Sequence, residues 1–136
     1  MLKGIHHIAF VVEDLDAATR LFVDVFGGSL KSRTYFEPGG VEVSLVSLGN
    51  VLFELARPIR PGTDTFNYMK EHGPGFYHLG FLVDDIPDAL ARLEAGGVGL
   101  IDRTAVSGVD WDVAWLRTDS VLHVPAQLTR PKKGQA

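Results

Sequence analysis

The feature that most constrains the fold is a stretch of sequence that occurs twice. Residues 5–15 read IHHIAFVVEDL and residues 76–86 read FYHLGFLVDDI, so that His7 corresponds to His78. A second match closes each half, because residues 54–58 (ELARP) resemble residues 127–131 (QLTRP). Two copies at so long a period are too few for a solenoid, which stacks many shorter repeats. The pattern therefore predicts a duplicated module.

Length and composition restrict the class of protein. A chain of 136 residues with 46% apolar and 22% charged residues fits one compact domain with its own core. We expect one domain over 1–136, with module one over about 4–58, a linker over 59–75 and module two over about 76–131. The net charge of −4 argues against a nucleic-acid surface, and no apolar run is long enough to span a bilayer. No signal-peptide pattern opens the chain and it has no cysteine, so we expect a cytoplasmic protein.

Both halves show the same order of predicted elements. The first half predicts a strand over 5–12, a helix over 15–26 and strands over 29–36, 41–48 and 51–57. The linker is rich in proline and glycine and predicts one short helix from Asp64 to Glu71. The second half predicts a strand over 76–83, a helix from residue 85 or 86 and strands over 98–104, 112–118 and 121–130. Residues 131–136 form a polar tail that we expect to fray. The fold class is therefore α+β, with two tandem βαβββ modules.

The first helix and the closing strands carry further expectations. An aspartate at 14 or 16 can cap the helix over 15–26, and Gly27 with Gly28 can end it. Its predicted apolar stripe consists of Leu15, Ala18, Leu21, Phe22, Val25 and Phe26. Arg57 and Arg130 follow the closing strands and should face away from the residues at 54 and 127.

Strand alternation selects four polar side chains as candidate metal ligands. In both copies the histidine shares its strand face with a small residue, and in both closing strands an oxygen-bearing side chain does the same. These four side chains are His7, Glu54, His78 and Gln127. Two imidazole nitrogens and two oxygens suit a divalent ion such as Zn, Ni, Co, Mn or Fe. A histidine packed in an apolar core is the alternative, but recurrence in both copies and the cost of burying Glu54 unpaired favour a metal.

The repeated motif resembles the vicinal oxygen chelate superfamily, which includes glyoxalase I, methylmalonyl-CoA epimerase, fosfomycin- and bleomycin-resistance proteins and extradiol dioxygenases. The resemblance rests on the segment HIAFVVEDL with the repeated modules, and covers the chain from about Gly4 to Pro131. In metal-dependent members each module supplies one ligand from its first strand and one from its last. The resemblance thus implies the same four ligands, in a metal site in the sheet cleft.

Within the superfamily the chain is most similar to methylmalonyl-CoA epimerase-like proteins, on the opening of module two, the end of the linker helix (KEHG) and the hairpin LGN at 48–50. That resemblance implies an isomerase that abstracts an α-proton through a metal-stabilised enolate. Glu42 then matches the family's non-ligand glutamate and would be a catalytic base. The chain departs from the epimerase pattern because Glu and Gln have exchanged modules, which makes Glu54 with Asp112 the mirror-image pair of bases.

Three functions follow as hypotheses. The first is the metal-dependent epimerase, acting on an acyl-CoA or related acid. The second is a glyoxalase I-like (lactoylglutathione lyase) enzyme acting on a thiol adduct, with Glu54 as both ligand and base. The third is a metal-free small-molecule-binding or drug-resistance protein, although such proteins generally lack the four ligands. The resemblance also implies a homodimer, whereas the sequence leaves open whether modules pair within or between chains.

Overall fold

The computed structural model describes residues 1–133, so the end of the predicted tail (134–136) lies outside the described residues. The chain divides into two compact units, which are taken one at a time below. The first unit is His7–Tyr77, and the second combines Met1–His6 with the chain from His78 onward. The expectation of a single domain with the module boundaries given above stays a prediction. No helix among residues 1–133 is long and apolar enough to cross a membrane.

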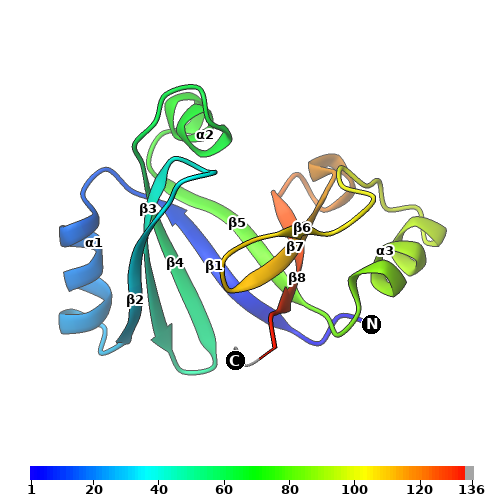
Figure 1. Ribbon diagram of the computed structural model, residues 1–136, viewed down its shortest axis with the longest axis horizontal. Coiled ribbons are helices and arrows are strands. Elements are labelled where there is room, and N and C mark those ends of the chain that lie inside the picture. The colour runs from blue at the N-terminus through cyan, green and yellow to red at the C-terminus, as the bar shows by residue number, and fades with distance from the viewer. Residues whose placement is uncertain (134–136) are drawn as a thin grey trace. The chain divides into compact units, whose positions relative to one another are not determined.

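The sheet of the first unit has the strand order β2-β3-β4-β1 (Figure 1). Its strands are β1 (Ile5–Val11, with His7–Val11 in this unit), β2 (Ser29–Phe36), β3 (Val41–Leu48) and β4 (Val51–Pro58). The antiparallel strands β2, β3 and β4 follow one another along the chain, whereas β4 returns to lie parallel to β1. The strands over 29–36, 41–48 and 51–57 are confirmed. The parallel pairing of β1 with β4 brings the first and last strands of the module side by side.

One face of this sheet is covered by α1 (Leu15–Arg20), as Figure 1 shows. The Asp14 carboxylate accepts a hydrogen bond from the Ala17 N–H at 2.9 Å and caps the helix, as predicted. Leu15, Val46 and Leu55 form the buried core between helix and sheet. The face of this sheet that packs against α1 is therefore the face that carries Val46 and Leu55.

The predicted apolar stripe of the first helix is wrong from Leu21 onward, except at Phe22. The helix continues as a π-helical turn over Leu21–Val25, in which the Phe26 N–H donates to the Leu21 carbonyl. The wider turn rotates the following side chains, so that Val23 packs on the core while Val25 is 72% exposed. Leu21 and Phe26 are also exposed.

The first unit ends with α2 (Asp64–His72), which confirms the short linker helix. Gly73 ends it with a φ of +81°, a conformation that favours glycine. Tyr68 of this helix packs on Tyr77, with ring centroids 4.5 Å apart. The helix therefore lies against the start of β5.

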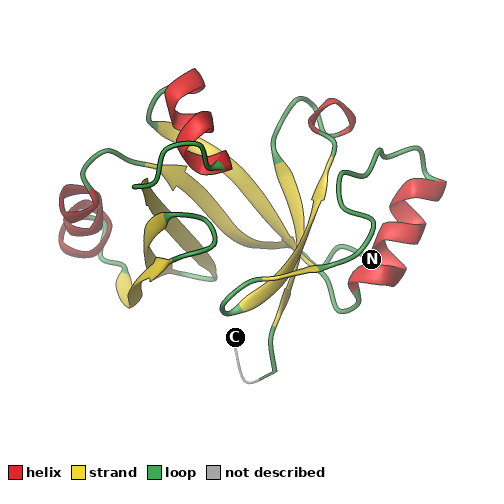
Figure 2. Cartoon of the chain, turned by 45° about the horizontal axis from the view of Figure 1, so that its top comes forward, coloured by secondary structure: helices red, strands yellow, loops and turns green. Residues whose placement is uncertain are grey.

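The sheet of the second unit has the strand order β5-β8-β7-β6 (Figure 2). Its strands are β5 (Gly75–Leu82, with His78–Leu82 in this unit), β6 (Val106–Ser107), β7 (Trp111–Leu116) and β8 (Ala126–Pro131). The first and last of these, β5 and β8, are parallel, as β1 and β4 are in the first unit. The chain's first residues belong here, since Lys3 donates its N–H to the Leu82 carbonyl and pairs with Asp84 at 3.0 Å.

The helix of this unit, α3 (Ile86–Ala95), packs on one face of its sheet (Figure 2). The Asp85 carboxylate caps it by accepting from the Asp88 N–H at 2.8 Å. Ile86, Ala89 and Leu90 are buried against the sheet. The core of the second unit therefore repeats the helix-on-sheet arrangement of the first.

The predicted strand over 98–104 is wrong. This segment makes one isolated β-bridge to β7, Leu100 with Leu116, without forming a strand, and the short edge strand lies further on, at β6. The Asp102 carboxylate accepts from the Trp115 N–H at 2.8 Å, so a side chain replaces part of the backbone ladder. The strand over 121–130 is confirmed only from Ala126, because a 3₁₀ turn (Thr118–Ser120) and an irregular turn precede it.

The second repeated motif has a structural role that both units share. Arg57 Nε donates to the Glu13 carbonyl at 3.2 Å, and Arg130 Nε donates to the Asp84 carbonyl at 2.8 Å. Each arginine thus ties the end of a module's last strand to the turn after its first strand. This confirms that both face away from the candidate ligands.

Candidate metal centre

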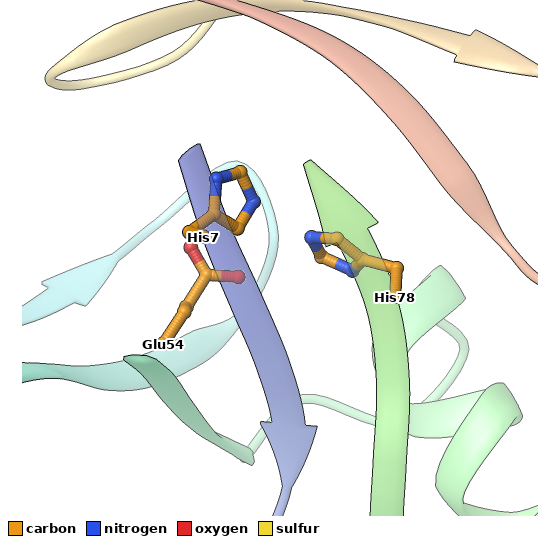
Figure 3. Close-up of side chains that lie close together, drawn as sticks. All are labelled: His7, Glu54 and His78. Atoms are coloured by element: carbon orange, nitrogen blue, oxygen red, sulfur yellow. The ribbon is translucent and has the colours of Figure 1, made fainter. Parts of the chain in front are cut away.

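The first unit places His7 and Glu54 on one face of its sheet, opposite the face that α1 covers. In the register of β1 with β4, His7 lies beside Leu52 and Ala9 lies beside Glu54, so both candidate ligands share a face. A ring nitrogen of His7 and a carboxylate oxygen of Glu54 lie within 4.8 Å of one another. Figure 3 shows these two side chains directed toward one another from β1 and β4. We call this the ligand face of the first unit.

The second unit repeats this placement with His78 and Gln127. Gly80 lies beside Gln127 in the register of β5 with β8, so His78 and Gln127 share one face of that sheet. Both are buried, at 3% and 4% exposed. The Thr129 hydroxyl donates to Gln127 Oε1 at 3.4 Å and so orients the amide. This is the ligand face of the second unit.

Burial sets the protonation of the candidate ligands. It raises the pKa of the Glu54 carboxyl from an ordinary 4.5 to about 7 and lowers the pKa of His78 from 6.5 to about 3. The His78 imidazole is therefore neutral at physiological pH, the form in which it can bind a metal ion. A divalent cation near Glu54 would displace the proton that burial favours.

The donor set fits a divalent metal ion. Each ligand face offers one imidazole and one oxygen ligand, His7 with Glu54 in the first unit and His78 with Gln127 in the second, and nitrogen and oxygen ligands suit a borderline ion. His7, fully buried beside the small Ala9, lies next to a carboxylate that is itself costly to bury. Within the first unit, His7 and Glu54 are close enough for one ion to bind both.

Glu42, predicted as a catalytic base, lies on the opposite sheet face from the candidate ligands of the first unit. Glu42 lies beside Arg57 in the register of β3 with β4, and Arg57 is on the opposite face from Glu54. Its carboxylate pairs with Arg57 at 3.3 Å and with Arg33 at 3.8 Å. The next residue of β3, Val43, lies on the ligand face, where it is paired with Ala56. Glu42 is therefore an ion-pair partner on the face that α1 covers.

Asp112, predicted as a mirror-image base, is placed in the corresponding way in the second unit. It lies beside Arg130 in the register of β7 with β8, and Arg130 is on the opposite face from Gln127. The ligand face of β7 instead carries Trp111, Val113 and Trp115. Of the two mirror-image bases, only Glu54 lies on a ligand face.

Sequence reasoning missed the residues that contact the candidate ligands. Trp115 packs edge-on against His78, with ring centroids 4.8 Å apart, and Thr129 orients Gln127. Both have a counterpart in the repeat, because Trp115 corresponds to Leu45 of the first half and Thr129 corresponds to Ala56. His6 is 8% exposed and packs on Trp111, with ring centroids 4.9 Å apart.

Comparison with known families agrees with this geometry. Residues 6–115 match the model of the Glyoxalase/Bleomycin resistance protein/Dioxygenase superfamily. The chain belongs to this superfamily. The predicted fold class, the vicinal oxygen chelate fold, is thereby confirmed. The superfamily contains several activities, so membership alone does not choose among the three hypotheses.

The relatives within the superfamily include two kinds of enzyme. The chain is 26% identical over 102 residues to the ethylmalonyl-CoA/methylmalonyl-CoA epimerase of Cereibacter sphaeroides, covering 74% of this chain and 76% of the relative. It is 30% identical over 112 residues to the lactoylglutathione lyase of Schizosaccharomyces pombe, covering 69% of this chain but only 37% of the relative. A variant of Streptomyces coelicolor methylmalonyl-CoA epimerase in complex with 2-nitronate-propionyl-CoA shares the fold, with a TM-score of 0.90 at 20% identity and coverage of 100% and 99%.

Proposed function

We propose that the chain is a metal-dependent isomerase of the methylmalonyl-CoA epimerase type, with His7, Glu54, His78 and Gln127 as the ligands of one divalent ion. One observation carries the proposal: each unit places an imidazole from its first strand and an oxygen ligand from its last strand on the same sheet face. The proposed ion is Zn, Ni, Co, Mn or Fe, because nitrogen and oxygen ligands in equal number suit these metals.

The bound ion would supply Lewis-acid polarisation of a substrate carbonyl, which acidifies the proton on the adjacent carbon. Glu54 would remove that proton. Glu54 is the carboxylate that the first unit places on its ligand face, where it can accept a proton. Glu42 and Asp112 lie on the opposite faces of their sheets and would take no part in the proton transfer.

The proposed substrate is an acyl-CoA. The support for it is the similarity to the Cereibacter sphaeroides epimerase and the complex of the Streptomyces coelicolor relative with a propionyl-CoA analogue. The homodimer that the resemblance implies and a cytoplasmic location belong to this proposal as predictions.

A second candidate is a glyoxalase I-like lyase, which the placement of Glu42 favours. Epimerisation needs a proton donor on the side of the carbon opposite the base. Because neither Glu42 nor Asp112 lies on a ligand face, the proposed epimerase would take that proton from solvent water. A lyase moves a proton between adjacent carbons, and one carboxylate can perform both transfers on the same side. Glu54 as the single base would serve this reaction.

The two candidates are separated by one experiment. Metal-reconstituted protein is incubated with methylmalonyl-CoA in D₂O, and α-deuterium is followed by NMR while chiral analysis follows inversion. The epimerase proposal predicts exchange with inversion that Glu54→Gln lowers on the order of 100-fold and that the control Glu42→Gln leaves unchanged. Turnover of the methylglyoxal–glutathione adduct without exchange would select the lyase. Neither reaction together with no metal uptake would select the metal-free binding protein.

A further inference from the structure

Trp115 lies beside both candidate ligands of the second unit. It is paired with Gln127 in the register of β7 with β8, and its indole meets the His78 imidazole edge-on, at an interplanar angle of 76° and a centroid distance of 4.8 Å. Edge-to-face contacts of this kind fix the relative orientation of two rings. The orientation of the His78 imidazole is therefore linked to the position of Trp115.

The backbone of Trp115 is itself held in place. Its N–H donates to the Asp102 carboxylate at 2.8 Å, and its carbonyl accepts from the N–H groups of Ile101 and Asp102 at 3.0 and 3.1 Å. Three hydrogen bonds on one residue, from a segment outside the regular ladder, restrain the strand where the indole projects. In the first unit β3 instead pairs with β2 in an antiparallel ladder, which has a register shift between Leu30 and Ser32, beside Leu45.

The two units differ at this position. Leu45 is paired with Glu54 in the first unit where Trp115 is paired with Gln127 in the second. The aromatic side chain accompanies the amide, which carries no charge and binds a cation more weakly than a carboxylate. Trp115 is thus an aromatic neighbour of the candidate ligands that the first unit lacks at the matching position.

We propose that Trp115 is a positioning residue that holds the His78 imidazole in the orientation required for metal binding. The inference rests on the proposed function, because it takes His78 to be a ligand. Residues that orient a metal-binding histidine change metal affinity without touching the ion. Trp115 acts by ring contact where such partners more often act by hydrogen bonds.

The test measures Co²⁺ affinity by titration calorimetry for the wild type and three variants. Trp115→Leu installs the residue of the matching position in the first unit and is expected to weaken Co²⁺ binding about tenfold. Trp115→Phe keeps an aromatic ring and should restore most of the affinity. Trp111→Leu is the matched control, because Trp111 lies on the same strand face but packs on His6. Thermal unfolding of each metal-free variant identifies any that fails to fold.

Unchanged affinity in Trp115→Leu, or an equal loss in Trp111→Leu, would overturn the proposal. If the wild type binds no Co²⁺, the proposed function fails, and positioning is then tested on the metal-free protein by NMR of the His78 ring. We expect one set of narrow ring signals in the wild type and in Trp115→Phe, and averaged signals in Trp115→Leu. The same narrow set in Trp115→Leu would show that the indole does not hold the imidazole.

Discussion

Replacing Glu54 with glutamine should change how the stability of the metal-free protein depends on pH. The folded protein raises the pKa of this carboxyl from 4.5 to about 7, so the folded state binds the proton more tightly than the unfolded state does. The resulting stabilisation is complete below pH 4.5 and is lost as the pH rises through 7. A shift of this size corresponds to roughly 3 kcal/mol of unfolding free energy, as an upper value.

The assay is urea unfolding in EDTA at pH 5 and pH 8, for the wild type and Glu54→Gln. We expect the wild type to lose up to roughly 3 kcal/mol relative to the variant between these values. The lowered pKa of His78 destabilises both proteins alike at acid pH, so it cancels in the comparison. Glu42→Gln serves as the control, because it removes an ion pair whose carboxylate is 31% exposed and which contributes about 1 kcal/mol or less. Parallel pH profiles for the wild type and Glu54→Gln would refute the reasoning.

Further expected outcomes concern the metal and the fold. The apparent Co²⁺ affinity should fall more steeply below pH 7 in the wild type than in Glu54→Gln, because only the wild type must release the proton of this carboxyl. Titration calorimetry in two buffers of different ionisation enthalpy measures the number of protons released. Leu55→Ala should cost about 2–5 kcal/mol in urea unfolding because Leu55 is fully buried, whereas Val25→Ser, at a residue 72% exposed, should change stability by about 0.5 kcal/mol or less. Asp85→Ala should cost about 1 kcal/mol by removing a helix cap, which the same measurement detects.

Sequence periodicity predicted the parts of the fold that depend on local pattern. The repeat gave the order of elements, and the aspartates at 14 and 85 cap their helices as their type suggests. The stripe beyond Phe22 was wrong because a π-helical turn changes the rotation per residue, and nothing in the residue types marks that turn. The segment at 98–104 has strand-like residues, but Asp102 satisfies the backbone of Trp115 with a side chain in place of a ladder.

The candidate site shows both the use and the limit of strand alternation. Alternation placed each candidate ligand on a strand face with a small residue, and the register of each unit then shows the histidine and the oxygen ligand on one shared face. The same rule would have placed Glu42 on the sheet face opposite Glu54. The hairpin pairs Leu48 with Val51, so counting residues back along both strands pairs Glu42 with Arg57. Arg57 was already expected to face away from Glu54. The ring contact of Trp115 with His78 depends on packing, which no sequence period encodes.

The measurement that tests the central claim most directly is metal content after reconstitution. Purified protein is loaded with Co²⁺, dialysed and analysed by elemental analysis, together with the variants His7→Ala and His78→Ala and the double variant. The account predicts about one ion per site in the wild type, and loss of bound metal when either histidine is replaced. Stoichiometric cobalt in a folded His7→Ala/His78→Ala protein would contradict the four-ligand site.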